Sequence, residues 1–343
     1  MKIEHKNNFG FLRLLLASLV IVSHSPEIMD HSRNREILSS LFGTISFGEL
    51  AVDGFFLISG YLILKSYYAT GSVKSYFYKR ILRIYPAFIV ASCFCLLIVA
   101  PLYTGLNLTE VIPVSDWPKY IFRMFILEGP SLDHMPEVAL NGAMWTIWFE
   151  FMCYVSIPVF FLLGLHNKKW YLLALFIILS IYLFTQITGK DLWLPYPIRL
   201  DFHHSTRLLS AFLIGGIFHF YQDKIEWKYT YSWIAFIGLV LSLYSKIFAE
   251  IGLFIFGGYL LFNFALNYKN KFLNAIGTKT DISYGVYLYA WPIQILIIKY
   301  IPNIHPHVLS LVTIFLAGIL GYLSWSFVEK PFMQLKKKVA IAW

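Results

Sequence analysis

The chain has 343 residues and a formal net charge of +9; 58% of its residues are hydrophobic and only 14% are charged. Soluble domains are roughly 45 to 50% apolar, so this composition excludes an ordinary soluble domain. The net charge alone would suit nucleic-acid binding, but most Lys and Arg fall on alternate loops between apolar segments, as membrane topology requires. The composition therefore predicts a polytopic membrane protein that contacts lipid and no nucleic acid.

Apolar segments near the roughly 20 residues that cross a bilayer recur along the whole chain. We expect an all-α integral membrane protein with about ten spans, over residues 9–25, 46–68, 86–104, 143–165, 170–188, 204–221, 231–247, 249–266, 283–300 and 306–328. The distribution of basic residues predicts that both termini are cytoplasmic. We assign residues 1–335 to a single membrane domain and 336–343 to a short basic cytoplasmic tail, with no appended soluble domain.

The first apolar segment contains two ionisable residues, Arg13 and His24. Eleven positions at about 100° each make about three helical turns, so the two side chains project from nearly the same face. An Arg at mid-depth costs about 2.5 kcal/mol or more and a titratable ring is unusual there, so both residues are candidates for a functional site. The segment also resembles a signal peptide cleaved near Ser25, but the many later spans need no separate export signal and favour a retained helix.

The second predicted span contains the string GELAVDGFFLISGYLI, residues 48–63. Glu49 and Asp53 are four residues apart and share a helix face, and Gly60 on nearly the same face permits another helix to approach closely. Two interpretations of Asp53 stay open. It pairs with a buried cation such as Arg13, or it orients a catalytic group.

The cytoplasmic segment over residues 72–86 carries Arg80 and Arg83 three positions apart, with Lys79 beside them. Two guanidinium groups on one helix face suit the oxygens of a phosphate, which they bind in bidentate fashion. A basic helix next to the membrane is also what topology predicts in any membrane protein. From spacing alone, the topological interpretation is favoured.

The fourth predicted span places Glu150 about two turns into the hydrocarbon, between Thr146 and Tyr154 at spacings of four. The shared face predicts a polar cavity wall in which hydroxyl groups lie above and below a carboxylate. The competing interpretation is a structural ion pair between Glu150 and a cation from another span, such as Arg207.

His203 and His204 precede Arg207 at the predicted external start of the sixth span. These residues suit an anionic or sugar acceptor, but we favour surface residues without a ligand. Two adjacent histidines without a third ligand are poor evidence for zinc. We therefore predict no metal site. The three cysteines all fall within predicted spans and indicate neither a metal site nor a disulfide: Cys93, Cys95 and Cys153.

Six motifs in order resemble the acyltransferase-3 family of membrane O-acyltransferases, and together they cover nearly the whole chain. They are Arg13 followed after ten residues by His24; VDGFF and SGY in residues 52–61; Arg80-x-x-Arg83 followed by Pro86; Trp145 with Glu150; ISYGVYLYAWP in residues 282–292; and SWSFVEKPF in residues 324–332. Many relatives have a histidine before the Trp-Pro of the fifth motif, where this chain has Ala290. Any role of that histidine is therefore not transferred.

The resemblance implies an enzyme, an acyltransferase for groups other than amino-acyl groups. Its donor would be cytoplasmic acyl-CoA, most often acetyl-CoA as a co-substrate, and its acceptor a hydroxyl of a cell-surface polysaccharide or lipid-linked sugar, such as O-antigen of lipopolysaccharide or capsule. Its location would be the cytoplasmic (inner) membrane. The assigned residues are, for catalysis, His24, Arg13, Asp53 and Glu150; for coenzyme A, Arg80, Arg83 and Lys79; and for the acceptor, Trp145, Tyr284 and Arg207.

Two chemical roles of His24 stay open. A sugar hydroxyl attacks a thioester poorly at neutral pH, so a neutral imidazole within hydrogen-bond reach would take its proton. Alternatively, the imidazole would accept the acyl group itself and pass it outward. A rival function is a secondary transporter or flippase of a glycan precursor, because intramembrane charges also mark transport paths. No inverted repeat that would support a transporter is visible in the sequence. Ala290 suggests a third possibility, a degenerate membrane scaffold without catalytic activity.

Overall fold

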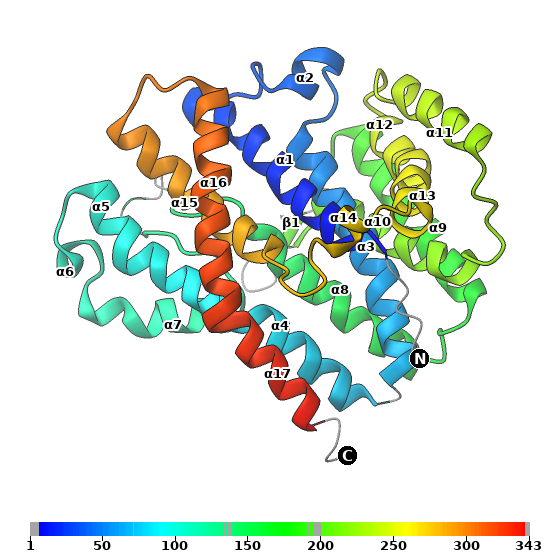
Figure 1. Cartoon of the computed structure of the whole chain (residues 1–343), viewed down its shortest axis with the longest axis horizontal. Helices are drawn as coiled ribbons and strands as arrows, with labels where there is room; N and C mark the ends of the chain where they lie inside the picture. The colour runs from blue at the N-terminus through cyan, green and yellow to red at the C-terminus, as the bar shows by residue number, and fades with distance from the viewer. Residues whose placement is uncertain are drawn as a thin grey trace. The chain divides into compact units, whose positions relative to one another are not determined.

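The computed structural model describes residues 7–70, 72–133, 135, 139–190, 193–194 and 200–339. Almost all regular structure in these ranges is helical, as Figure 1 shows. A short antiparallel pairing joins β1 (Trp193–Leu194) to β2 (Leu200–Asp201). The prediction of an all-α membrane protein is confirmed, with this two-residue ladder as the exception within the described ranges.

The helices follow one another along the whole described chain. They are α1 (Phe9–Asp30), α2 (Ile37–Phe42), α3 (Phe47–Thr70), α4 (Val73–Phe94), η1 (Cys95–Val99), α5 (Ala100–Thr104), α6 (Leu108–Val111), η2 (Val114–Asp116), α7 (Trp117–Phe125), α8 (Trp145–Leu162), α9 (Lys168–Thr188), α10 (Phe202–Tyr221), α11 (Tyr229–Ser242), α12 (Ala249–Gly252), η3 (Leu253–Gly257), α13 (Gly258–Asn267), α14 (Lys271–Ala275), α15 (Ser283–Tyr300), α16 (Pro306–Ser324), η4 (Trp325–Glu329) and α17 (Lys330–Val339). Of the predicted basic tail, residues 340–343 lie outside the described residues.

Seven helical segments of the described chain are long and apolar enough to cross a membrane. They are Phe9–Asp30, Phe47–Thr70, Val73–Thr104, Trp145–Leu162, Lys168–Thr188, Ala249–Asn267 and Pro306–Leu335. The other three predicted spans are also helices, α10, α11 and α15, but α11 is shorter and the other two contain more polar residues. The protein is therefore a multi-pass membrane protein, and the count of ten and the orientation of the termini stay predictions.

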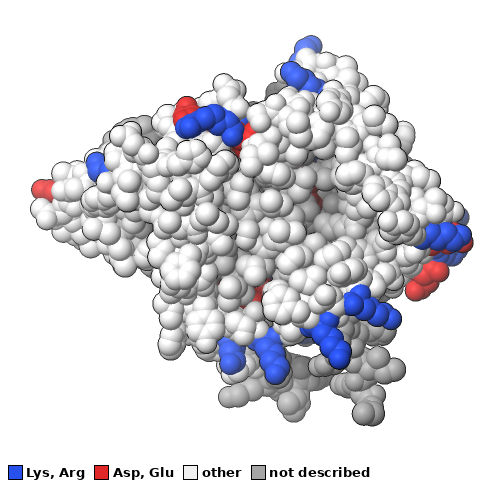
Figure 2. Space-filling view, turned by 45° about the horizontal axis from the view of Figure 1, so that its top comes forward, with Lys and Arg blue, Asp and Glu red and all other residues white. Residues whose placement is uncertain are grey.

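The surface of these helices suits a lipid environment. Leu162, Phe176 and Leu311 are 78%, 70% and 68% exposed, respectively, which would be costly in water. Figure 2 shows one face of the molecule, where atoms of residues other than Lys, Arg, Asp and Glu cover most of the area and charged side chains gather in a few places. This distribution agrees with a protein whose helices face hydrocarbon.

Contacts divide the chain into two compact units, each assembled from segments that are distant in sequence. The first unit comprises Met1–Leu12, Leu38–Val73 and Phe149–Asn274, and the second comprises Arg13–Ile37, Lys74–Trp148 and Ala275–Trp343. Both units draw on the start, the middle and the later part of the chain. The assignment of residues 1–335 to one membrane domain stays a prediction.

In the first unit, α10 packs between α3 and α9 (Figure 1). Glycines on both helices bring the backbones of α3 and α10 into contact. A Cβ atom on Gly60 would lie 1.9 Å from the carbonyl oxygen of Phe212, and a Cβ atom on Gly215 would lie 2.0 Å from that of Leu57. The predicted close approach at Gly60 is confirmed, and α10 is the helix that approaches.

In the second unit, α15 packs against α16 through another pair of glycines. A Cβ atom on Gly285 would lie 2.7 Å from the Cα atom of Gly321. A π-helical turn, η4, then follows α16 and leads into α17. Such turns insert an extra residue into a helix and frequently occur at functional sites. Here the turn ends at Glu329, whose side chain contacts Arg83.

Candidate active site

In the second unit, α15 lies beside α1 and runs in the same direction. Arg13 near the start of α1 contacts Asp281, two residues before α15. Eleven residues further along α1, the ring of His24 meets the ring of Trp291, which lies ten residues after Asp281. Nearly equal steps in the same direction along both segments require parallel helices, so the two contacts form two separate layers about 16 Å apart.

The first layer is a cluster of four charged side chains, named here the arginine cluster: Arg13, Arg83, Asp281 and Glu329. One carboxylate oxygen of Asp281, Oδ2, lies 3.0 Å from Nη2 of Arg13 and 2.9 Å from Nη2 of Arg83. Oε2 of Glu329 lies 3.5 Å from Nη1 of Arg83. The two arginine side chains are 24% and 21% exposed, whereas those of Asp281 and Glu329 are 10% and 1% exposed. Two guanidinium groups and two carboxyl groups thus meet in a mostly buried site.

Asp281 is ionised at neutral pH because of its neighbours. The hydroxyl of Ser283 donates a hydrogen bond of 2.7 Å to Oδ1. Burial raises the pKa of Asp281, but the charges of Arg83 and Arg13 and the hydrogen bonds from Ser283 outweigh burial and bring the pKa to about 2. Asp281 therefore meets the two guanidinium groups as a carboxylate.

Arg83 is held by further contacts around its guanidinium group. Its central carbon lies 5.9 Å from the ring centroid of Tyr284, a cation–π arrangement. Its Nη1 lies 3.4 Å from the sulfur of Met333. The hydroxyl of Tyr284 in turn donates to the carbonyl of Ile84 at 3.2 Å. Tyr284, which the sequence assigned to the acceptor, thus contacts Arg83, which the sequence assigned to coenzyme A.

Arg80 and Lys79 lie one turn earlier on α4 and are both half-buried. The guanidinium of Arg80 lies 5.7 Å from the ring centroid of Tyr76, which is fully buried. Arg80 and Arg83 therefore meet different surroundings, although they share a helix face.

The second layer surrounds His24, which is half-buried. Its ring lies 4.9 Å from that of Trp291 at 80°, an edge-to-face arrangement. The indole of Trp291 donates to the carbonyl of Ala139 at 2.8 Å. It also covers Gly142, where a Cβ atom would lie 2.6 Å from the indole. Within the described ranges the imidazole nitrogens make no hydrogen bond, so the ring is positioned by packing and its nitrogens stay available.

A buried hydrogen-bond network fixes the backbone next to His24. Gln294 of α15 donates to the hydroxyl of Ser25 at 2.8 Å and to the carbonyl of Ile21 at 2.9 Å. Ser310 of α16 donates to the same hydroxyl at 2.8 Å. Three helices are therefore tied together one residue beyond the histidine.

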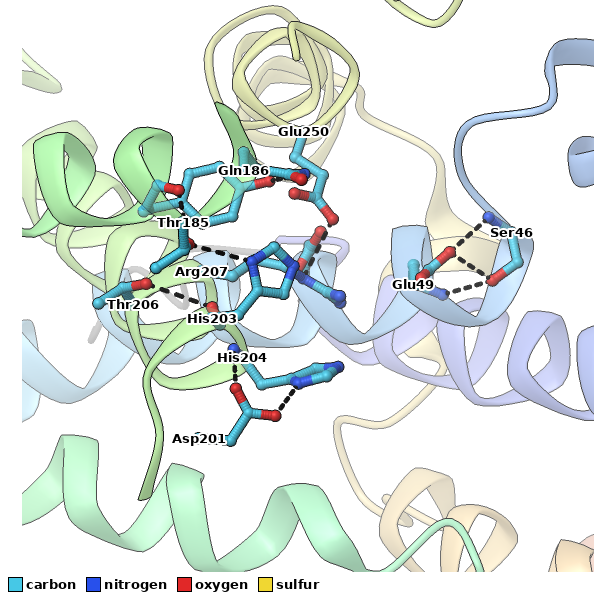
Figure 3. A network of polar contacts seen from close by, with 12 residues as sticks. Ser46, Glu49, Thr185, Gln186, Asp201, His203, His204, Thr206, Arg207 and Glu250 are labelled. Atoms are coloured by element: carbon cyan, nitrogen blue, oxygen red, sulfur yellow. Dashed lines mark hydrogen bonds and ion pairs between the residues drawn. The ribbon is translucent and has the colours of Figure 1, made fainter. Parts of the chain in front are cut away.

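The first unit contains a separate buried network around Arg207 (Figure 3). Its Nε lies 3.0 Å from Oδ1 of Asp53 and 3.5 Å from Oε1 of Glu250. Arg207 is 3% exposed and Asp53 is fully buried. The prediction that Asp53 pairs with a buried cation is confirmed, but that cation is Arg207. The suggested partner Arg13 is wrong, because Arg13 pairs with Asp281. The interpretation of Arg207 as a surface residue is also wrong, because its side chain is buried.

The residues that precede Arg207 bind to one another (Figure 3). Asp201 accepts hydrogen bonds from the backbone and the ring of His204, at 3.0 Å for the backbone N–H. The ring of His203 shares a hydrogen bond of 3.2 Å with the hydroxyl of Thr185. This group joins the end of α9 to the start of α10.

Glu150 also lies in the first unit and has hydroxyl partners. Ser59 donates to its Oε1 at 3.1 Å, and the hydroxyl of Tyr154 donates to the same oxygen. The predicted neighbour Tyr154 is confirmed. Thr146 instead bonds to the hydroxyl of Tyr287 at 2.7 Å, and the alternative pairing of Glu150 with Arg207 is wrong.

The predicted site residues thus fall into two sets. The second unit holds His24, Arg13, Arg80, Arg83, Lys79, Trp145 and Tyr284, and the first unit holds Asp53, Glu150 and Arg207. Trp145, the first residue of α8, is 42% exposed.

Sequence reasoning missed three carboxylates, Asp281, Glu329 and Glu250. A signal existed for two of them, because Asp281 directly precedes the motif ISYGVYLYAWP and Glu329 lies within SWSFVEKPF. For Glu250, the signal was a single acidic residue at the start of an apolar segment.

A family model and one curated relative match this chain over most of its length. Residues 7–328 match the acyltransferase domain of acyltransferase family 3. The chain is 30% identical over 342 residues to the O-acetyl transferase of Shigella phage Sf6, which covers 96% of this chain and 97% of that protein. It is 31% identical over 173 residues to Nodulation protein 10 of Rhizobium leguminosarum bv. viciae, over 45% of this chain and 44% of that protein. No solved structure matches.

The chain therefore belongs to acyltransferase family 3. It is a membrane enzyme that transfers acyl groups other than amino-acyl groups, and the transporter interpretation of its intramembrane charges is set aside.

Proposed function

We propose that this enzyme transfers an acetyl group from cytoplasmic acetyl-CoA to a hydroxyl of a cell-surface polysaccharide or its lipid-linked precursor, such as an O-antigen or capsule unit, in the cytoplasmic (inner) membrane. The relative from Shigella phage Sf6, an O-acetyl transferase, supports the acetyl group. The observation that carries the proposal is the pair of layers along α1. Arg13 joins a cluster of arginines, and His24 presents an imidazole about three turns away on the same helix.

His24 is proposed as the group that activates the acceptor. Its imidazole would take the hydroxyl proton as the sugar oxygen attacks the thioester carbon. The carbon–sulfur bond then breaks, and the proton passes to the coenzyme A sulfur. In the alternative, the imidazole first accepts the acetyl group and then yields it to the sugar. The packing of His24 against Trp291 restricts the ring in both cases.

The donor is proposed to bind at α4, where Arg80, Arg83 and Lys79 would contact the phosphates of coenzyme A. Guanidinium groups bind phosphate oxygens strongly. Arg83 already has two carboxylate partners, of which Glu329 is the more distant at 3.5 Å. A phosphate would therefore replace Glu329 more readily than Asp281.

The acceptor is proposed to contact Trp145, whose exposed aromatic ring suits stacking on a sugar. Tyr284, which the sequence also assigned to the acceptor, is half-buried and packs on Arg83. Arg207, which the sequence assigned to the acceptor, is buried between Asp53 and Glu250. We therefore propose that Arg207 and Asp53 stabilise the first unit. The catalytic role of Glu150 stays a prediction from the sequence.

The proposal is tested by replacing His24. Inner-membrane vesicles that contain the His24→Ala variant, supplied with labelled acetyl-CoA and acceptor glycan, should transfer at least about 100-fold less label than wild type, because general-base catalysis contributes about 100- to 10,000-fold. His307→Ala, at an exposed histidine outside both layers, is the matched control. Transfer at the wild-type rate by His24→Ala would reject the assignment, and NMR of the glycan identifies the acetylated hydroxyl.

A further inference from the structure

We propose that Asp281 is a positioning residue, which holds the guanidinium groups of Arg13 and Arg83 at a fixed separation for binding of the acyl donor. The consequence for the donor rests on the proposed function, which assigns Arg83 to coenzyme A. The positioning itself rests on the geometry of the arginine cluster alone.

A single oxygen atom of Asp281 contacts both arginines. The two Nη2 atoms lie within 3.0 Å of Oδ2, so they are held close together despite their like charges. Arg13 belongs to α1 and Arg83 to α4, and Asp281 precedes α15. This carboxylate therefore joins three segments that are distant in sequence.

Asp281 is itself held in one orientation. Its second oxygen accepts the hydrogen bond of 2.7 Å from Ser283, at the first position of α15. The side chain is 10% exposed, which limits competition from water. Its orientation is therefore set by α15, and α15 transmits that orientation to both arginines.

Glu329 does not have the same role. It lies 3.5 Å from Arg83 and, in the described part of the chain, forms no ion pair with Arg13. Its other oxygen, Oε1, accepts from the hydroxyl of Ser324 at 3.3 Å. Asp281 is thus the carboxylate of the cluster that contacts both Arg13 and Arg83.

The main test is a comparison of kinetic constants in the full-length protein. Asp281→Asn keeps the size of the side chain but removes its charge, so the two arginines separate. We expect KM for acetyl-CoA to rise at least 10-fold, with a smaller change in kcat and an unchanged KM for the acceptor glycan. Asp281→Glu, which restores a carboxylate, should bring KM for acetyl-CoA back to within about three-fold of wild type.

A matched control exists in the loop after α7. Asp133 also pairs with two cations, Arg123 at 2.7 Å and Lys119. Asp133→Asn therefore makes the same chemical change at another carboxylate that bridges two cations. It should leave KM for acetyl-CoA unchanged. If Asp281→Asn lowers only kcat or the amount of folded protein and leaves that KM unchanged, Asp281 is merely structural and the proposal is overturned.

A second measurement tests whether Asp281 joins the two arginines, and it needs no enzyme activity. It therefore stays informative if wild type transfers no acetyl group, a result that would reject the proposed function. Thermal unfolding of Asp281→Asn, Arg83→Gln and the double variant forms a double-mutant cycle, and Arg13→Gln forms another. Non-additive shifts in Tm in both cycles support a carboxylate shared by the two arginines. Additive shifts in either cycle overturn it.

Discussion

Asp53 and Glu250 share one guanidinium group, that of Arg207, inside the first unit. Arg207 contacts Asp53 at 3.0 Å and Glu250 at 3.5 Å, and one oxygen of each carboxylate has no hydrogen-bond partner among the described residues. Glu49 on the same helix as Asp53 accepts instead from the backbone and hydroxyl of Ser46. One guanidinium neutralises one carboxylate, so a second buried negative charge beside it would be costly.

At the residue scale we therefore expect unequal effects from two matched substitutions. Asp53→Asn should lower the free energy of unfolding by about 3 kcal/mol, because it leaves Arg207 with the more distant partner. Glu250→Gln should change it by less than about 1 kcal/mol, because the amide keeps the shape of the side chain and adds no buried charge. Unfolding of the purified variants in detergent measures both. Equal losses would contradict this account of the network.

At the scale of elements, glycines allow the close packing of α3 against α10. The backbones of α3 and α10 meet where Gly60 faces Phe212 and Gly215 faces Leu57. Small residues allow such approach, which in a membrane gains van der Waals contact between helices. The same contact brings Asp53 of α3 and Arg207 of α10 within 3.0 Å. The packing of two helices therefore creates the buried ion pair.

We expect Gly60→Ala to lower the free energy of unfolding by about 1 to 3 kcal/mol, because the added Cβ would lie 1.9 Å from a backbone oxygen that only a helix shift can move away. Gly318→Ala in α16 is the control, since its Cβ would meet nothing within 4 Å. It should be neutral or slightly stabilising, because Ala favours helix over Gly. Equal destabilisation of both variants, measured by thermal unfolding, would argue against the close contact.

At the scale of the whole molecule, the parallel arrangement of α1 and α15 constrains the topology. Two parallel helices that both cross a bilayer begin on the same side, which agrees with the prediction that α15 is the ninth of ten spans. The basic residues predict that this side is the cytoplasm. Arg13 and Asp281, at the starts of the two helices, would then lie on the cytoplasmic side, where acetyl-CoA is found.

This topology predicts the accessibility of single cysteines introduced after the three native ones are replaced. Cysteines at Ser72 and Lys279 should react with a membrane-impermeant maleimide only after the cell is opened. Cysteines at Asn34 and Asn303, beyond the ends of α1 and α15, should react in intact cells whose outer membrane is permeabilised. All four positions are exposed. Labelling of positions 34 and 303 from opposite sides would contradict two parallel spans.

The sequence by itself determined the class of the protein and the residues to examine. Hydropathy and the helical period are local properties, so they identified the helices and placed Arg13 and His24 on one face. The order of motifs such as Arg80-x-x-Arg83 was enough to indicate the family. The spacing of Glu150 and Tyr154 likewise predicted a contact that the structure contains.

Only the tertiary structure decided which charges meet. Asp281 is 268 residues from Arg13 and 198 from Arg83, and Asp53 is 154 residues from Arg207. A sequence contains several cations and carboxylates that could pair, and the choice among them depends on which helices pack together. Gly60 and Gly285 show that this packing rests on a few close backbone contacts. For that reason the role of Asp281, whose sequence signal is only its place directly before the motif ISYGVYLYAWP, became visible beside the two arginines that it joins.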